Sequence, residues 1–377
     1  MVIGFVVTLV PLIILHEIGH MMVAKYFGVW AKEFGIGYPP RITKLFQWQE
    51  TVFTLNWLPL GGFVRLEGEA MFEEDEEGDE TSEPVVEAAD AREAAVEAQK
   101  HSLYAKPPWQ QILIYLSGPV MNILTAWIVA VLIFTVGIPS VRVRIEEVAP
   151  NSPAAQAGMQ AGDIIAAING HEIEDMIDVQ EYTQENVGQS TDVTLERGNE
   201  ELTVSLTPRE NPPEGEGSMG ILIGGIENPN QLQTYPPGEA LQLGTSYIVR
   251  IASMSFSVPV QVLRGTVAAE DARPVGIVGI SRIAGQSMET SIEKGALYPI
   301  LNLIALVSAS LGLFNLLPIP ALDGGRILFS VIEMIRHEPL TPEIQEKIIM
   351  VTMMLLVLLF IVITAMDIIA PLDVSGF

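Results

Sequence analysis

The segment LHEIGH at residues 15–20 constrains this chain most, because it places ionisable side chains inside a long apolar run. No charged residue occurs from residue 2 to residue 15, and after His20 the apolar run continues through residue 24. This length is close to the roughly 20 apolar residues that a membrane-spanning helix needs. Ionisable groups inside such a helix are costly and indicate a function. The run therefore predicts a first membrane span that carries chemistry.

The spacing of the two histidines indicates a metal site. His16 and His20 are four residues apart, so on a helix they share one face and can bind one ion. Glu17 lies beside the first histidine and can take a proton from a metal-bound water. A charged cluster that matches a short pattern by chance is the alternative. In an apolar helix, however, these three groups need a compensating partner, and a metal ion is the simplest one.

The composition narrows the class of protein and the ligand types. Hydrophobic residues make up 49% of the chain and charged residues 18%, which favours a membrane protein. Cysteine is absent, so a metal must be held by His, Asp, Glu or water. The formal net charge is −26, but residues 67–97 alone contribute −13. No basic patch is present, which disfavours a nucleic-acid partner.

The distribution of apolar runs predicts a multi-span α-helical membrane protein with about four transmembrane helices, a membrane-associated β-hairpin and an inserted α+β domain. We divide the chain into a first span (1–27), a β-hairpin region (28–66), an acidic segment (67–106), a second span (107–139), a small soluble domain (140–210), a linker with an interfacial helix (211–296), a third span with its following loop (297–336), and a fourth span with the C-terminus (337–377).

Residues 51–55 and 63–66 are rich in β-formers and flank the turn signal PLGG at residues 59–62, which predicts a hairpin. Trp48 and Trp57 suit a membrane–water interface. The hairpin either only connects two spans or offers an edge strand that pairs with an extended peptide near the metal. The acidic residues that follow are expected to be disordered up to residue 83 and to form a solvated helix over 84–99, with no chemistry assigned.

Residues 141–210 alternate between strand and turn signals, including Asn169-Gly170, and indicate a small α+β module. Its segment NSPAAQAGMQAGDIIAAING resembles a bacterial, permuted PDZ domain, which implies binding of a peptide C-terminus or an extended segment. A short strand at 220–223 is assigned to the linker. Residues 239–263 are interpreted as an amphipathic helix at the membrane surface, with a true span as the alternative.

Lys and Arg residues gather between spans one and two and between spans three and four, so both loops are expected in the cytoplasm, with both termini and the PDZ-like module outside. His16, His20 and Asp323 then lie at one depth near the cytoplasmic face. This makes Asp323 the expected third ligand, and two histidines with one carboxylate leave an open position for water, as in catalytic zinc sites. Asp323 as a simple turn residue is the alternative, while Asp367 falls at the outer end of span four.

Three motifs in three spans resemble the site-2 protease family of intramembrane zinc metalloproteases: HEIGH at 16–20, GPVMN at 118–122, and the segment from Asn315 to LDG at 322–324. The single PDZ-like module resembles the bacterial regulator-of-sigma-E branch. The resemblance implies a Zn²⁺ cofactor held by His16, His20 and Asp323, with Glu17 as the catalytic base. It further implies that four other residues contact the substrate or the transition state, namely Asn122, Gly118, Pro119 and Asn315.

The resemblance also implies substrates in the lipid bilayer that are single-span proteins, such as anti-sigma factors or leftover signal peptides, and a location in the inner (plasma) membrane. Two alternatives remain at this stage: a non-proteolytic scaffold of the same fold, and a metal transporter that uses the intramembrane ligands. Many members of this branch carry two PDZ domains, whereas this chain has one, and the acidic segment at 67–99 is not part of the family's pattern.

Overall fold

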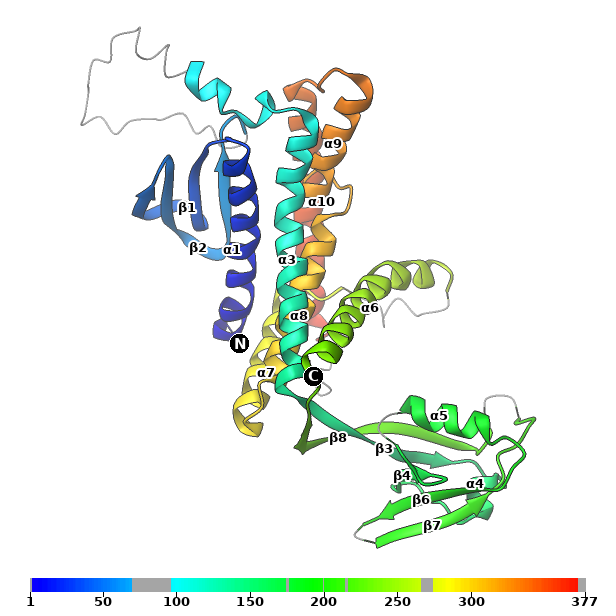
Figure 1. Cartoon of the computed structure of the whole chain (residues 1–377). Helices are drawn as coiled ribbons and strands as arrows, with labels where there is room; N and C mark the ends of the chain where they lie inside the picture. The colour runs from blue at the N-terminus through cyan, green and yellow to red at the C-terminus, as the bar shows by residue number, and fades with distance from the viewer. Residues whose placement is uncertain are drawn as a thin grey trace. The chain divides into compact units, whose positions relative to one another are not determined.

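The computed structural model describes residues 2–69, 96–173, 176–198, 200–213, 216–265 and 274–371. The chain separates into two compact units, one formed by residues 1–135 and 236–377 and the other by residues 136–235. The first unit holds most of the helices and a small sheet, and the second is an α/β module (Figure 1).

Four helices of the first unit are long and apolar enough to cross a membrane, in agreement with the predicted number of spans. They are α1 (Val2–Tyr26), α3 (Pro108–Val136), α8 (Tyr298–Asn315) and α10 (Pro342–Ile369). Only a small part of α10 is buried inside the protein, as expected for a helix that presents most of its apolar side chains to lipid. The described part of this unit also contains the helices α6 (Pro237–Leu263), α7 (Ile277–Lys294) and α9 (Asp323–Arg336) and a short 3-10 helix at Leu103–Ala105.

The two strands of the β-hairpin region are joined by a different turn from the predicted one. Strands β1 (Ala31–Trp48) and β2 (Thr51–Leu66) meet at a turn over Gln49 and Glu50, whereas residues 59–62 lie inside β2. The predicted turn at residues 59–62 is therefore wrong. Gln49 has a positive φ of 55°, a conformation typical of a tight turn that its sequence did not signal.

Both long strands bend, so that the two-stranded sheet acts as four short strands. Phe34 in β1 pairs with Phe53 on one side and with Val64 on the other, and Phe46 pairs with Phe53 from the opposite direction. The short strands therefore lie in the order 41–48, 51–56, 33–36 and 62–66. Among the described residues, residues 62–66 have a strand on one side only, so their other edge is free, and β2 lies beside α1 (Figure 1).

A hydrophobic cluster joins this sheet to the helices that carry the predicted site. Its buried members come from α1, the sheet and α3, and include Met21, Ala24, Phe34, Leu66, Ile114 and Tyr115. The close approach of α1 and α3 depends on Gly19, since a Cβ there would lie 2.6 Å from the Ser117 carbonyl oxygen. The small residue in the HEIGH motif thus lets the two helices touch beside the histidines.

The second unit is built on the sheet order β7-β6-β4-β3-β8, with β5 paired to β4. Its elements are β3 (Ile138–Val148), α4 (Pro153–Gln156), β4 (Ile164–Ile168), β5 (His171–Glu172), α5 (Met176–Glu185), β6 (Thr191–Arg197), β7 (Glu200–Leu206) and β8 (Ile221–Gln233). Alternate residues of the strands, such as Val143, Ile145, Val193 and Leu195, are buried in one apolar core.

Several segments differ from their predicted assignments. Strand β8 was expected in a linker, but it pairs along the whole of β3 and belongs to the α/β unit. Helix α9 occupies residues that were expected to be a loop, and α7 was not predicted as a separate helix. Residues 239–263 are helical, as predicted, in α6, which is not one of the four candidate spans. Most of the acidic segment, residues 70–95, lies outside the described residues.

Candidate active site

Helix α1 presents His16 and His20 on one face, one turn apart, as their spacing predicted. Both side chains are nearly buried, with 6% and 7% of their surface exposed. Their rings meet edge to face with centroids 4.8 Å apart. The two imidazoles therefore point to one place between the helices.

Asp323 is the first residue of α9, just after the loop that follows α8. A carboxylate in the first turn is favoured by the helix dipole. The next two residues, Gly324 and Gly325, pack tightly against that loop: a Cβ would lie 2.3 Å from the Leu317 carbonyl oxygen and 2.2 Å from that of Ile319, respectively. This contact fixes the start of α9 and with it the position of the Asp323 carboxylate.

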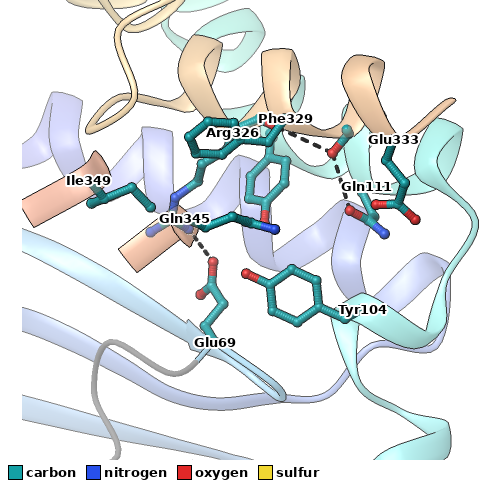
Figure 2. A pocket seen from close by; sticks show the side chains of 10 residues that line it. Glu69, Tyr104, Gln111, Arg326, Phe329, Glu333, Gln345 and Ile349 are labelled. Atoms are coloured by element: carbon teal, nitrogen blue, oxygen red, sulfur yellow. Dashed lines mark hydrogen bonds and ion pairs between the residues drawn. The ribbon is translucent and has the colours of Figure 1, made fainter. Parts of the chain in front are cut away.

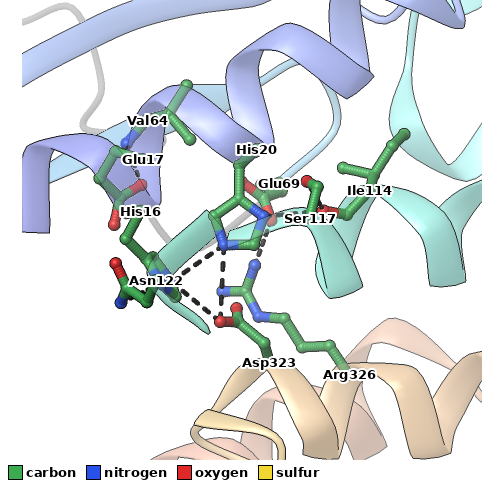
Figure 3. Close-up of polar contacts among 10 residues, drawn as sticks. All are labelled: His16, Glu17, His20, Val64, Glu69, Ile114, Ser117, Asn122, Asp323 and Arg326. Carbon is green, nitrogen blue, oxygen red and sulfur yellow. Dashed lines mark hydrogen bonds and ion pairs between the residues drawn. The ribbon is translucent and has the colours of Figure 1, made fainter. Parts of the chain in front are cut away.

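The three side chains bring one atom each to a common point (Figure 3). His16 Nε2 lies 3.1 Å from His20 Nε2 and 3.0 Å from Asp323 Oδ2, and His20 Nε2 lies 3.5 Å from the same oxygen. In a tetrahedral zinc site with bonds of about 2.0–2.1 Å, neighbouring ligand atoms are about 3.3 Å apart. The observed separations and the donor set, two imidazole nitrogens and a carboxylate oxygen, fit a zinc ion with an open fourth position.

Helix α3 supports the cluster from the opposite side. The Ile114 carbonyl oxygen lies 2.8 Å from His20 Nδ1. A carbonyl only accepts hydrogen bonds, so Nδ1 carries the hydrogen and Nε2 keeps a lone pair for a metal. Asn122 lies beside the other histidine, with Nδ2 3.1 Å from His16 Nδ1. Between these two contacts, a Cβ on Gly118 would lie 2.2 Å from His20 Nε2, so the glycine leaves the space that the ligand atoms need.

Glu17 lies next to the cluster and is held by the sheet. Its Oε2 accepts a hydrogen bond of 3.0 Å from the backbone N–H of Val64, on the free edge of β2. A cavity of about 420 Å³ opens beside these groups. Its walls come from α1, β1, the edge of β2, α3, the end of α8, the start of α9 and α10, and they include Glu17, Tyr38, Gly62, Phe63, Val64, Asn315 and Asp323.

A second, smaller cavity adjoins the first, and both are lined by Glu69, Tyr115 and Arg326 (Figure 2). Arg326 Nη1 forms an ion pair with Glu69 Oε1, and the guanidinium lies over the Tyr115 ring at 5.5 Å from its centroid. Glu69 also approaches the backbone N–H of Leu66 at 3.4 Å. The ion pair thus connects the end of β2 to α9, the helix that carries Asp323.

The structure brings His16, Glu17, His20 and Asp323 together and places Asn315 on the cavity wall. Asn122 was expected to contact substrate, but it is fully buried, and neither it nor its neighbours Gly118 and Pro119 line the cavity. The sequence did not indicate the Val64 amide or the Ile114 carbonyl, because backbone groups leave no side-chain signal. Arg326, three residues after Asp323, could have been found from its position one helical turn further along α9.

The α/β unit has a groove of its own, of about 390 Å³, between α5 and the start of β8. Apolar and small residues line it, including Val179, Thr183, Met219, Gly220, Ile221 and Ile223. Elsewhere in the unit, Arg197 donates two hydrogen bonds of 2.7 Å to the buried carboxylate of Asp163. These bonds hold the pKa of Asp163 below its ordinary value.

Two PDZ domains of known structure resemble part of the chain. A PDZ domain of the SdrC-like protein from Listeria innocua is 25% identical, and the match covers 22% of this chain and 92% of that chain with a TM-score of 0.20. The HtrA3 PDZ domain bound to a phage-derived ligand is 26% identical over 23% of this chain and 88% of that chain, with a TM-score of 0.17.

Full-length relatives are more informative. The regulator of sigma-W protease RasP of Bacillus subtilis is 28% identical, with 97% of this chain and 98% of the relative covered. A putative zinc metalloprotease of Clostridium perfringens, CPE1693, is 32% identical, with 96% of each chain covered. The model of peptidase family M50 matches residues 4–359. Because this match runs over nearly the full length, the chain belongs to peptidase family M50, the site-2 family of zinc metalloendopeptidases.

Proposed function

We propose that this protein hydrolyses peptide bonds within or near the membrane spans of single-span proteins, with His16, His20 and Asp323 as zinc ligands and Glu17 as the general base. The observation that carries the proposal is the convergence of three ligand atoms from α1 and α9 at separations of 3.0–3.5 Å, with Glu17 beside them on a cavity wall. Both helices belong to the unit that holds the four candidate spans.

The roles of the residues follow from their contacts. A zinc ion at this site supplies an activated water near neutral pH and polarises a carbonyl group. Glu17 takes the proton of the attacking water and gives it to the leaving amine. The Val64 N–H holds the carboxylate through Oε2 and so leaves Oε1 for proton transfer. The two histidines are buried and Asp323 is partly buried, which limits their motion.

The free edge of β2 is the proposed substrate platform. A membrane-spanning substrate hides its amides in helical hydrogen bonds and must unwind before cleavage. Within the part of the chain that the structure describes, residues 62–66 have no strand partner on the side facing α1, and several of them line the cavity. An extended substrate segment can add to this edge, with side chains in alternating directions. Asn315, which also lines the cavity, can offer a side-chain amide to the bound backbone.

The substrate class is proposed from the named relatives. RasP of Bacillus subtilis is named as a regulator of the sigma-W system, which makes an anti-sigma factor the first candidate for this chain, with a leftover signal peptide as the second. We place the protein in the inner (plasma) membrane, with the active site toward the cytoplasmic side and both termini and the α/β unit outside. The distribution of Lys and Arg supports this orientation.

The α/β unit is proposed to dock a peptide C-terminus or an extended segment in the groove between α5 and β8. Strand β8 is at the edge of the sheet order, so its start can pair with an added strand while Met219 and Val179 receive an apolar side chain. This docking selects substrates that an earlier cleavage has already shortened.

Cleavage by purified full-length protein tests the proposal. Wild type is incubated in detergent with a model single-span substrate, beside Glu17→Gln. We expect cleavage by wild type and none above background by Glu17→Gln, with equal zinc content in both. Equal cleavage by the two proteins would contradict the assigned mechanism. Absence of cleavage by zinc-loaded wild type on several substrates would favour a scaffold, and zinc flux into liposomes would favour a transporter.

A further inference from the structure

The carboxamide of Asn122 is fully buried between α1, α3 and α8, with 0% of the residue exposed. Its nitrogen Nδ2 lies 3.1 Å from His16 Nδ1. Its oxygen Oδ1 is buried and makes no hydrogen bond within the part of the chain that the structure describes. A buried carbonyl oxygen without a donor is costly, so this arrangement needs an explanation.

The chemistry of His16 supplies one. When Nε2 of a neutral imidazole offers its lone pair to a metal, Nδ1 carries the hydrogen and becomes a donor. A carboxamide NH₂ is also a donor, so the two nitrogens cannot bond. The oxygen and nitrogen of an Asn side chain are assigned from the hydrogen bonds that they make. Rotation of the amide by 180° brings Oδ1 to His16 Nδ1 and gives the orphaned oxygen its donor.

The position of Asn122 along α3 agrees with this role. Ile114, Gly118 and Asn122 follow one another at intervals of four residues and so share one face of the helix. The first holds His20 through its carbonyl, the second leaves space at the ligand atoms, and the third lies beside His16. Each metal-facing imidazole thereby meets one group of α3 at its far nitrogen (Figure 3).

Helix α8 packs against Asn122 from behind. Ser308 Oγ donates a buried hydrogen bond of 2.8 Å to the backbone carbonyl oxygen of Asn122. A Cβ at Gly312 would lie 3.3 Å from the Asn122 Cβ, so the two helices are in close contact there. Asn122 is fully buried and is not among the residues that line the cavity, where a substrate would lie.

We infer that Asn122 is a positioning residue: its Oδ1 accepts the Nδ1–H of His16 and keeps Nε2 of this ring aimed at the metal. The role differs from the substrate contact expected from the sequence, because it acts through His16 and requires an acceptor atom. It rests on the proposed zinc ligand set. Loss of such a supporting partner of a ligating histidine typically weakens metal binding by about 10–100-fold.

The test compares an acceptor with apolar replacements in full-length protein. Asn122→Asp keeps an oxygen in nearly the same shape, whereas Asn122→Leu and Asn122→Ala remove it, the first at similar volume and the second with a small cavity. Zinc affinity is measured by competition with a chromophoric chelator, and thermal melting monitors the fold. Ser308→Ala is the matched control, since it removes the bond to the same residue's backbone and leaves the side chain in place.

We expect the Leu and Ala variants to bind zinc about 10–100-fold more weakly than wild type, while Asn122→Asp and Ser308→Ala stay within a few-fold. Wild-type affinity in the Leu or Ala variant would overturn the inference. An equal loss of zinc affinity in Asn122→Asp would also overturn it, because the oxygen acceptor would then be irrelevant. The comparison of Asn122→Asp with Asn122→Ala remains possible even where Asn122→Leu does not fold. Absence of zinc binding by wild type would instead refute the ligand set itself.

Discussion

Gly118→Ala is the smallest change that should disable the site. An ideal Cβ at this position would lie 2.2 Å from His20 Nε2 and 2.7 Å from His16 Nε2, whereas real Cβ atoms do not approach other atoms closer than 3.0 Å. To reach ordinary contact, the imidazoles or α3 must move by roughly 1 Å. Functional groups need to stay within about 0.5 Å of their working geometry. A displacement of about 1 Å can cost about 100-fold in rate, or about 2.7 kcal/mol in activation free energy.

The assay measures zinc affinity and kcat/KM on a model single-span substrate, with all proteins in the same detergent. We expect Gly118→Ala to lose about 100-fold or more in kcat/KM and to bind zinc more weakly. Gly238→Ala is the neutral control, since no atom outside its local chain lies within 4 Å of its Cβ. Gly244→Ala controls for helix packing, because its Cβ would meet the Val131 side chain at 2.8 Å without touching a ligand or Asn122. Wild-type zinc affinity and turnover in Gly118→Ala would refute the reasoning.

Three further predictions concern the surroundings of the site and the α/β unit. Val64→Pro removes the N–H that holds Glu17, a charge-assisted bond worth about 1.5–3 kcal/mol, so kcat should fall about 10–100-fold at unchanged zinc content; an unchanged kcat would count against this contact. Glu69→Gln leaves the Arg326 guanidinium without its counter-charge and should lower stability by about 3 kcal/mol, seen as a lower melting temperature. Because the folded-state pKa of Asp163 is depressed, its contribution to stability is present above the unfolded value of about 3.9 and is lost as pH falls through the folded value. Asp163→Asn should therefore weaken hydrogen-exchange protection of β4 and β6 at pH 7, and its difference from wild type should shrink as the pH falls below about 3.9.

The sequence predicted the parts of the site that depend on local periodicity. His16 and His20 share a helix face because the helical repeat dictates it, and the apolar run around them marks a span. Asp323 is some three hundred residues away, and its arrival beside the histidines could be predicted only from the expected depth of each span end. The structure places it there, 3.0 Å from His16 Nε2.

What the sequence could not provide depends on tertiary packing and on backbone atoms. Residues 59–62 carry a strong turn signal, but the turn of the hairpin lies at Gln49 and Glu50. Strand β2 continues through residues 59–62 because it pairs with β1 both before and after this point. Helix α9 was assigned to a loop because it lies in a short stretch between two spans. Such a stretch does not exclude a helix, and the apolar residues of α9 follow a helical repeat. The contact of Asn122 with His16 is set by the packing of α1 against α3, and no local pattern contains that information.

The zinc content of Asp323→Ala tests the central claim most directly, because this residue joins the two distant halves of the site. Metal analysis is performed on wild type, Glu17→Gln and Asp323→Ala after equal dialysis against a weak chelator. We predict about one zinc per chain, as for any site with a single set of three ligands, in wild type and in Glu17→Gln, and far less in Asp323→Ala. Unchanged zinc in Asp323→Ala would contradict the proposed ligand set.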